Sequence, residues 1–100
     1  MIKHIVLFQL KPFASQEEKL AKMQEIKSGL EGLMGVVKEL KSMEVGLNCN
    51  PADGQYDMAL VSTFDTMEGL HAYANHPQHV AVAKMVAEAR QSRACVDFVM

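Results

Sequence analysis

The chain has little of several features that would place a protein in a class at once. Ten Lys and Arg against twelve Asp and Glu leave a formal net charge of -2. This balance provides no basic field for the phosphates of a nucleic acid, so we expect no nucleic-acid partner. The apolar run Ile5 to Phe8 is cut by Gln9 and Lys11, and it is too short for a signal-peptide core or a membrane helix. We therefore expect a cytoplasmic protein with no membrane partner.

Cysteine is also scarce. Cys49 and Cys95 lie far apart and form no Cys-x-x-Cys pair, which predicts free thiols rather than a disulfide or a zinc site. His76 and His79 could offer two metal ligands at i and i+3, but zinc needs three or four, and no Cys, Asp or Glu has a companion spacing. The sequence therefore predicts no metal and no other cofactor.

Repeats, linkers and low-complexity tracts are missing, so residues 1–100 are expected to form one domain. Within it, the period of the apolar residues alternates between two, typical of strands, and 3.6, typical of helices. The expected order is a strand over 2–10, a helix opening at Ser15, strands over 36–47 and 56–64, a helix opening at Asp65 and broken at Asn75–His76, its continuation from Pro77, and a strand over 94–100. This is the β-α-β-β-α-β order of a ferredoxin-like α+β fold, a four-stranded antiparallel sheet with its helices on one face.

Local signals support these helices and the hairpin between the middle strands. Ser15 with Glu18 forms a capping box, Asp65 with Glu68 is the expected cap of the second helix, and Pro77 suits a first helical turn. The segment 48–54 is dense in turn formers. The apolar stripe expected on the first helix is Leu20, Met23, Ile26, Leu30 and Leu33.

Both faces of the predicted sheet carry apolar side chains, although two helices can cover only one face. The residues predicted on the uncovered face are Ile5, Leu7, Ala59 and Val61. A second copy of the chain is the simplest cover for them, so a symmetric homodimer is expected. Asp57 and Asp97 are predicted to face this dimer barrel and to pair with Lys3 or Lys41, or to be solvated near a barrel end, without a catalytic role.

Three of the four histidines and one of the two tyrosines surround elements that could meet in such a fold. Histidine has the unperturbed pKa nearest physiological pH, so two imidazoles in an apolar setting can move a proton or bind an acidic ligand. His76, directly before Pro77, is expected to cap or pack at the helix start, and His71 to be solvated. His4, Tyr73 and His79 remain as the candidate site.

Five segments in order resemble the stress-responsive α/β-barrel (Dabb) family of dimeric ferredoxin-like proteins. They are residues 2–8 (IKHIVLF), 44–46 (EVG), 56–64 (Tyr-Asp and the following strand), 72–79 (AYxxHPxH) and 96–98 (VDF). The resemblance covers nearly the whole chain. It implies a dimeric α+β barrel formed by two four-stranded sheets.

By motif position, the resemblance to this family also implies roles for the site residues. A cofactor-free plant polyketide cyclase of the family uses a histidine base, and this implies His79 as base, Tyr73 as its orienting or oxyanion partner, and His4 as a second polar anchor. A neutral imidazole can take a C–H proton next to a carbonyl. That cyclase has aromatic residues on the first helix, where this chain has Met23 and Ile26, so the implication does not extend to a polyketide substrate.

Two function classes stay open at this point. One is a pocket between helices and sheet that binds, or transforms, a small apolar carbonyl compound. Its expected lining residues are Val6, Phe8, Met23, Ile26, Leu60 and Val82. The alternative is a non-catalytic structural or interaction protein whose role is the dimeric barrel itself. A cleft of roughly 300 Å³ or more favours the first class, and a closed core favours the second.

Overall fold

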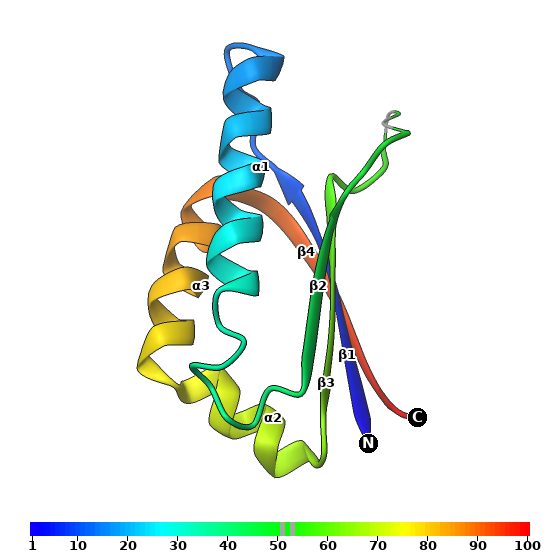
Figure 1. The fold of residues 1–100 in the computed structure, drawn as a ribbon. Helices are drawn as coiled ribbons and strands as arrows, with labels where there is room; N and C mark the ends of the chain where they lie inside the picture. Colours follow the sequence, from blue (N-terminus) through cyan, green and yellow to red (C-terminus); the bar gives the residue numbers. More distant parts are fainter. Residues whose placement is uncertain (51, 53) are drawn as a thin grey trace.

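Four antiparallel strands form one sheet, and three helices lie against one of its faces (Figure 1). The computed structural model describes residues 1–50, 52 and 54–100. The elements in chain order are β1 (Ile2–Leu10), α1 (Gln16–Glu31), β2 (Ser42–Leu47), β3 (Met58–Phe64), α2 (Met67–Asn75), α3 (Pro77–Ala89) and β4 (Arg90–Val99). The strand order β2-β3-β1-β4 confirms the predicted ferredoxin-like arrangement, with the second helix split into α2 and α3 at the expected place.

The central strand β1 sets which side chains share a face. Val6 of β1 lies opposite Leu60 of β3 and opposite Cys95 of β4. Directly paired residues of antiparallel strands project to the same face, and residues two apart along a strand do so as well. The face of Val6 is therefore also the face of His4, whose partner on β4 is Asp97.

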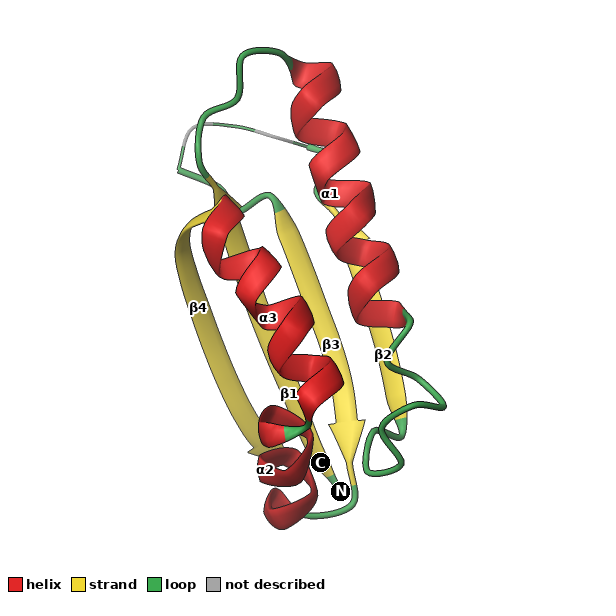
Figure 2. Cartoon of the chain, turned by 90° about the vertical axis from the view of Figure 1, so that its left-hand side faces the viewer, coloured by secondary structure: helices red, strands yellow, loops and turns green. Residues whose placement is uncertain are grey.

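The hydrophobic core lies between this face and the helices. Its fully buried members include Ile26 of α1, Val45 of β2 and Phe64 of β3. Viewed through the helices, α1 and α3 lie in front of the sheet, while β4 runs along the left edge beside them (Figure 2). The helices therefore cover the edge strand β4 less than they cover the three other strands, and most residues of β4 are exposed.

The hydrogen bonds at the helix starts explain why the capping residues of α1 and α3 could be predicted from the sequence. Ser15 Oγ accepts a hydrogen bond from the Glu18 backbone amide at 3.2 Å, which confirms the predicted cap of α1. Pro77 occupies the first turn of α3, and His76 Nδ1 accepts from the Gln78 amide at 3.1 Å. His76 is therefore a capping residue, because its ring satisfies a backbone donor that a helix start leaves free.

Other boundaries differ from the prediction. Thr66, not Asp65, caps α2, and its Oγ1 accepts from the Gly69 amide at 3.0 Å. Leu20 was expected on the apolar stripe of α1 but is exposed. The last strand begins at Arg90, four residues earlier than predicted, and β3 begins at Met58 rather than at residue 56.

The predicted strand over 36–47 is wrong in its first half. β2 begins at Ser42, and residues 32–39 form turns. Gly35 has a φ of +83°, a left-handed conformation that suits glycine. Val37 and Leu40 are both buried, with amide hydrogen bonds that reach back to the carbonyls of Leu33 and Val37. Their spacing of three residues is typical of helical turns. The prediction was wrong because it interpreted these two apolar residues as part of a strand.

The predicted hairpin joins β2 to β3, which pair in antiparallel register from Ser42–Thr63 to Leu47–Met58. Asn48 organises the described part of the turn: its Oδ1 accepts from the Asn50 amide at 2.8 Å and its side-chain amide donates to the Tyr56 carbonyl at 2.7 Å. Pro51 and Asp53, which the turn prediction included, lie outside the described residues.

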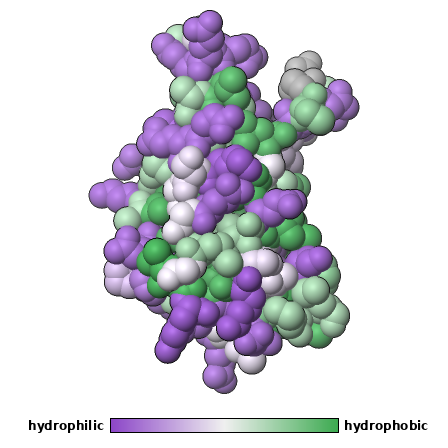
Figure 3. All heavy atoms as spheres, in the orientation of Figure 1, coloured by the Kyte–Doolittle hydropathy of each residue, from purple (hydrophilic) through white to green (hydrophobic). Residues whose placement is uncertain are grey.

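The opposite, outer face of the sheet is apolar and carries no helix (Figure 1). Ile5 pairs with Val61 and with Val96 there, and Val96 and Phe98 are 54% and 43% exposed in the single chain. Hydrophobic surface reaches the right-hand side of the molecule, where this face lies (Figure 3). None of the helices in the described part of the chain is long and apolar enough to span a bilayer.

Candidate functional site

A small pocket of about 120 Å³ lies between α3 and the helix-facing side of the sheet. The three residues singled out in the sequence, His4, Tyr73 and His79, all line it. The other lining residues are Val6, Phe8, Leu30, Leu60, Ala83, Val86, Arg90 and Arg93. The fold therefore brings together side chains from both ends of the sequence in a mostly apolar space with a polar wall.

Tyr73 occupies the end of α2 and is almost fully buried. Its ring lies 5.1 Å from that of Phe64 and 4.3 Å from that of His79, centroid to centroid. Among the described residues its hydroxyl has no hydrogen-bond partner, which is unusual for a buried polar atom. Burial raises the pKa of Tyr73 to about 12. The hydroxyl thus stays protonated at neutral pH and is free to donate to a ligand atom.

His79 lies in the first half of α3, three residues after the cap His76. Its Nδ1 lies 3.0 Å from the carbonyl oxygen of Ala74, so Nδ1 carries the proton and donates. Burial lowers the pKa of His79; the carbonyl of Ala74 opposes this shift, and the charges of His4, Arg93 and His76 add to it. The ring is neutral at neutral pH, with Nε2 unprotonated, which is the form that a general base requires.

His4 forms the opposite wall of the pocket. Its Nδ1 contacts the Asp97 carboxylate in a hydrogen bond, and its side chain is only 12% exposed. A carboxylate at Nδ1 orients the ring and favours the tautomer whose free nitrogen is Nε2. The thiol of Cys95 lies 3.7 Å from the same Nδ1 atom. His4 is thus held from β4 and belongs to a polar cluster at the sheet edge.

The predicted ligand-binding residues divide into two groups. Val6, Phe8 and Leu60 line the pocket, whereas Met23, Ile26 and Val82 do not. Ile26 is fully buried in the core, and Met23 and Val82 pack against that core. The part of α1 that reaches the pocket is its last turn, through Leu30.

The prediction for the two aspartates was wrong in their placement and partners. Asp97 lies on the helix-facing side, paired with His4, because Val96 and Phe98 take the outer face. Asp57 Oδ1 pairs with Lys19 at 2.8 Å, and its Oδ2 accepts from the Leu10 amide at 2.7 Å. Asp57 therefore ties the end of β1 to α1, a structural role as expected but not at the barrel.

Arg90 and Arg93 were missed as pocket residues. Both belong to β4, and Arg93 is directly opposite Phe8 in the β1–β4 register. Knowledge of the pairing register between β1 and β4 would have revealed them, because Phe8 was already predicted to line the pocket and its partner on β4 shares its face. Their positive charges make the open side of the pocket favourable for a ligand with a partly negative oxygen.

The comparisons with known proteins agree with this architecture. A sequence profile of the stress responsive A/B barrel domain, Dabb, matches residues 2–100. The chain belongs to this family. The resemblance seen in the sequence is thereby confirmed, whereas no protein among those with curated functions matches the chain.

Solved structures extend the family relationship. A dimeric ferredoxin-like protein of unknown function from Bacteroides fragilis is 43% identical, with a TM-score of 0.90 over 99% of this chain and 95% of that one. A dimeric ferredoxin-like protein of unknown function from Thermobifida fusca is 29% identical, with a TM-score of 0.83 over 99% and 90%. A hydroxynitrile lyase from Passiflora edulis shares the fold at 22% identity, with a TM-score of 0.82 over 99% and 92%.

Proposed function

We propose that this Dabb protein is a homodimer in which each protomer binds a small carbonyl compound and transfers a proton next to its carbonyl group. The observation that carries the proposal is the buried Tyr73 hydroxyl, which lacks a partner among the described residues and lines the same pocket as His79 and His4. A buried donor of this kind is costly unless a ligand or water accepts from it.

The size of the pocket limits the ligand. Its volume of about 120 Å³ falls short of the cleft of roughly 300 Å³ that was expected to favour ligand binding, so the pocket has room only for a ligand of few heavy atoms. Apolar walls from Val6, Phe8 and Leu60 favour an uncharged body. A ketone or aldehyde with few heavy atoms meets both conditions better than a polyketide does.

The arrangement supports a short sequence of proton transfers. His79 Nε2 takes a proton from the carbon next to the carbonyl, the electron pair of that C–H bond moves to the oxygen, and the Tyr73 hydroxyl stabilises the oxygen by donating a hydrogen bond. The protonated His79 then returns a proton to the same carbon. His4 serves as the second polar anchor, because Asp97 fixes its ring at the pocket wall.

The homodimer is supported by the apolar outer face and by the relatives. The Bacteroides fragilis and Thermobifida fusca proteins are both described as dimeric. In the single chain, Val96 and Phe98 leave large apolar side chains in water on a face without helices. A second sheet packed there would remove them from water at a gain of about 25 cal/mol per Å².

Exchange of α-protons for deuterium tests the proton transfer directly. Butanone in D₂O buffer loses its α-proton NMR signals when a base removes them, and we expect the native protein to accelerate this loss. His79→Ala is expected to reduce the acceleration by about 10²- to 10⁴-fold, the usual contribution of one general base, with little change in melting temperature. Tyr73→Phe should also slow exchange, since it removes only the donor.

His71→Ala is the matched control, because His71 is an exposed histidine on α2. Its exchange rate should equal that of the native chain. Equal rates for His79→Ala and the native protein would contradict the assignment of the base. If the native protein neither binds butanone nor exchanges its protons above the buffer rate, the non-catalytic barrel role becomes the better account.

A further inference from the structure

A second cluster of reactive side chains lies beside the pocket, at the edge of the sheet. His4 Nδ1, Cys95 Sγ and an oxygen of Asp97 all lie within 4.8 Å of one another. The thiol is 3.7 Å from the imidazole nitrogen and 3.9 Å from the carboxylate oxygen. We propose that these three residues bind a divalent transition-metal ion with tetrahedral preference, of which Zn²⁺ is the natural example.

The strand register explains how residues more than ninety positions apart form one set. Cys95 and Asp97 are two apart on β4, so their side chains share a face. Asp97 lies directly opposite His4 on β1, and Cys95 lies opposite Val6, which makes it the diagonal neighbour of His4. Because the ligands come from the first and the last strand, they do not have the short sequence spacing of a local zinc motif. The pairing of the two strands is needed to recognise the set.

The distances suit a tetrahedral ion. Zinc binds nitrogen and oxygen at about 2.0 to 2.2 Å and sulfur at about 2.3 Å, which separates the ligand atoms by roughly 3.3 to 3.6 Å in a tetrahedron. Cys95 Sγ is already near this distance from both partners. His4 and Asp97, now hydrogen-bonded through Nδ1, must separate by a small side-chain rotation to admit the ion.

The donor chemistry selects among metals. One thiolate, one imidazole and one carboxylate form a mixed S, N, O set, which suits Zn²⁺ and Co²⁺ and does not suit the hard ions Mg²⁺ and Ca²⁺. Three protein ligands leave a fourth position for water, as in catalytic rather than structural zinc sites. Cys95 and Asp97 are exposed, so solvent can reach that position.

The position of the cluster keeps it open in the proposed dimer. His4, Cys95 and Asp97 share the helix-facing side of the sheet with Val6, whereas the proposed dimer uses the outer face. β4 lies beside the helices rather than behind them (Figure 2). Burial, together with the Asp97 carboxylate, raises the pKa of the Cys95 thiol, and the Arg93 guanidinium opposes this shift. Binding of the ion would therefore release the thiol proton.

Metal binding at this place does not depend on the proposed proton transfer, but it would affect the pocket. His4 belongs to both the cluster and the pocket wall. An ion on Nδ1 takes over the role of Asp97 in orienting the imidazole, and it places a positive charge next to the carbonyl pocket. Because metal binding does not require the proposed proton transfer, binding of the ion can be measured without any substrate.

Cobalt titration of the metal-free protein is the direct test, since Co²⁺ replaces Zn²⁺ and reports its ligands by absorption. We expect one Co²⁺ per chain, visible d–d bands of a tetrahedral ion, and a sulfur-to-cobalt charge-transfer band that Zn²⁺ abolishes. Cys95→Ser should remove the charge-transfer band. Asp97→Asn should keep the thiol and weaken Zn²⁺ binding by at least about tenfold in competition with a chromophoric chelator.

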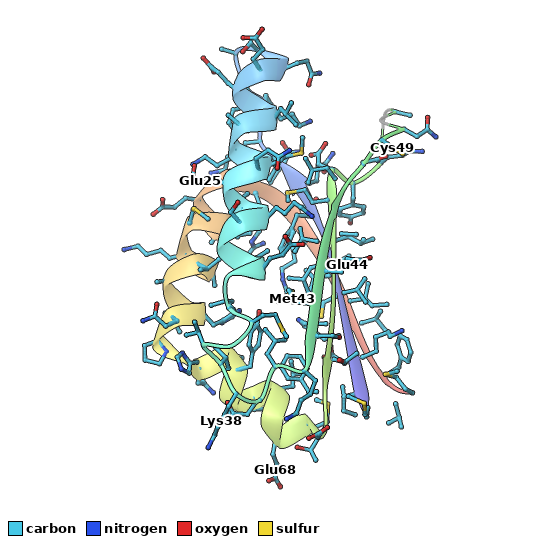
Figure 4. All side chains as sticks on the ribbon, viewed as in Figure 1. Glu25, Lys38, Met43, Glu44, Cys49 and Glu68 are labelled. Carbon is cyan, nitrogen blue, oxygen red and sulfur yellow. The ribbon has the colours of Figure 1, made fainter. Side chains whose placement is uncertain are left out.

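Cys49→Ser is the matched control, because Cys49 is the other thiol, is also exposed, and lies in the turn after β2, away from β4 (Figure 4). This variant should retain the charge-transfer band and the native affinity. The proposal is overturned if the native protein shows no sulfur-to-cobalt band. It is equally overturned if Cys95→Ser keeps the band, or if Cys49→Ser loses it. Circular dichroism of each variant verifies that the fold is intact.

Discussion

The two faces of the sheet are both apolar in sequence but differ in what covers them. On the helix-facing side, Val6 and Phe8 of β1 are almost fully buried by α1, α3 and the core. On the outer side, Val96 and Phe98 of β4 remain exposed in the single chain. Valine and phenylalanine side chains are thus buried in the core on one face of the sheet and exposed to solvent on the other.

This difference assigns the two proposed roles, ligand binding and dimer formation, to opposite faces of the sheet. The covered face can hold a pocket, because α3 and the strands enclose a space of about 120 Å³ that Tyr73 and His79 line. The outer face has no helix and offers assembly instead. An apolar patch of paired strands without a cover is typical of a protein–protein interface. Substitutions placed on one face or the other can separate these two roles.

The largest expected effect comes from truncating one phenylalanine on each face. Phe8 is 5% exposed and Phe98 is 43% exposed. Phe8→Ala should lower the free energy of unfolding by about 3 to 5 kcal/mol at every protein concentration, because it leaves a cavity in the core. Phe98→Ala should cost much less in the monomer and more as concentration rises, since only the proposed dimer would cover that side chain. Urea unfolding at low and high protein concentration measures both.

A concentration-independent cost for Phe98→Ala, equal to that of Phe8→Ala, would mean that the two faces are equally buried in the single chain. It would contradict the distinction between a core face and an assembly face.

A charge on the outer face should dissociate the proposed dimer. Leu7 lies on that face beside a depression of about 370 Å³ that Gly46, Tyr56 and Ala59 also line. Leu7→Lys would place an uncompensated ammonium from each protomer in the interface, at a cost of about 3 kcal/mol each, or roughly 10⁴-fold in the dimer dissociation constant. Light scattering coupled to gel filtration gives the mass of the species at micromolar concentration.

Val80→Lys is the control for this substitution, because Val80 is an exposed residue of α3 on the opposite side of the molecule. It should leave the dimer intact. A native chain that stays monomeric at high concentration would remove the dimer proposal, and dissociation by both variants would show that charge alone, rather than the outer face, is responsible.

Much of the fold could be predicted because its signals are local. The cap at Ser15, the proline at the start of α3 and the alternation in β1 each depend on residues within one turn or one strand. The segment from residue 36 to 41 failed for the same reason. Val37 and Leu40 are compatible with a strand by hydrophobicity, but tertiary burial selected a turn after Gly35.

The candidate site was predictable in part. His4, Tyr73 and His79 were singled out by residue type and by family resemblance, and the fold places all three at one pocket. Asp97 and Cys95 were missed as partners of His4, because their relation depends on the register between β1 and β4. Such a register is set by long-range pairing, which no local sequence pattern encodes.

The smallest expected effect concerns the titration of His79 on α3. Burial lowers the pKa of this ring below the ordinary value near 6.5, so the folded chain accepts the proton at a lower pH than the unfolded chain does. The resulting stability is complete above the unfolded-state pKa and is lost as the pH falls below it, through the lowered folded-state pKa. His4 of β1, Arg93 of β4 and His76 act in the same direction through their charges.

His79→Gln cannot titrate, so its unfolding free energy should fall less than that of the native chain between about pH 7.5 and about pH 5.5. His71→Gln, at an exposed position of α2, is the control for the substitution itself, because it replaces a histidine that lies outside the pocket. Urea unfolding of the three proteins at the two pH values measures these differences. If His79→Gln and the native chain lose the same stability on acidification, burial does not lower the pKa of this ring, and the pocket does not favour a neutral imidazole.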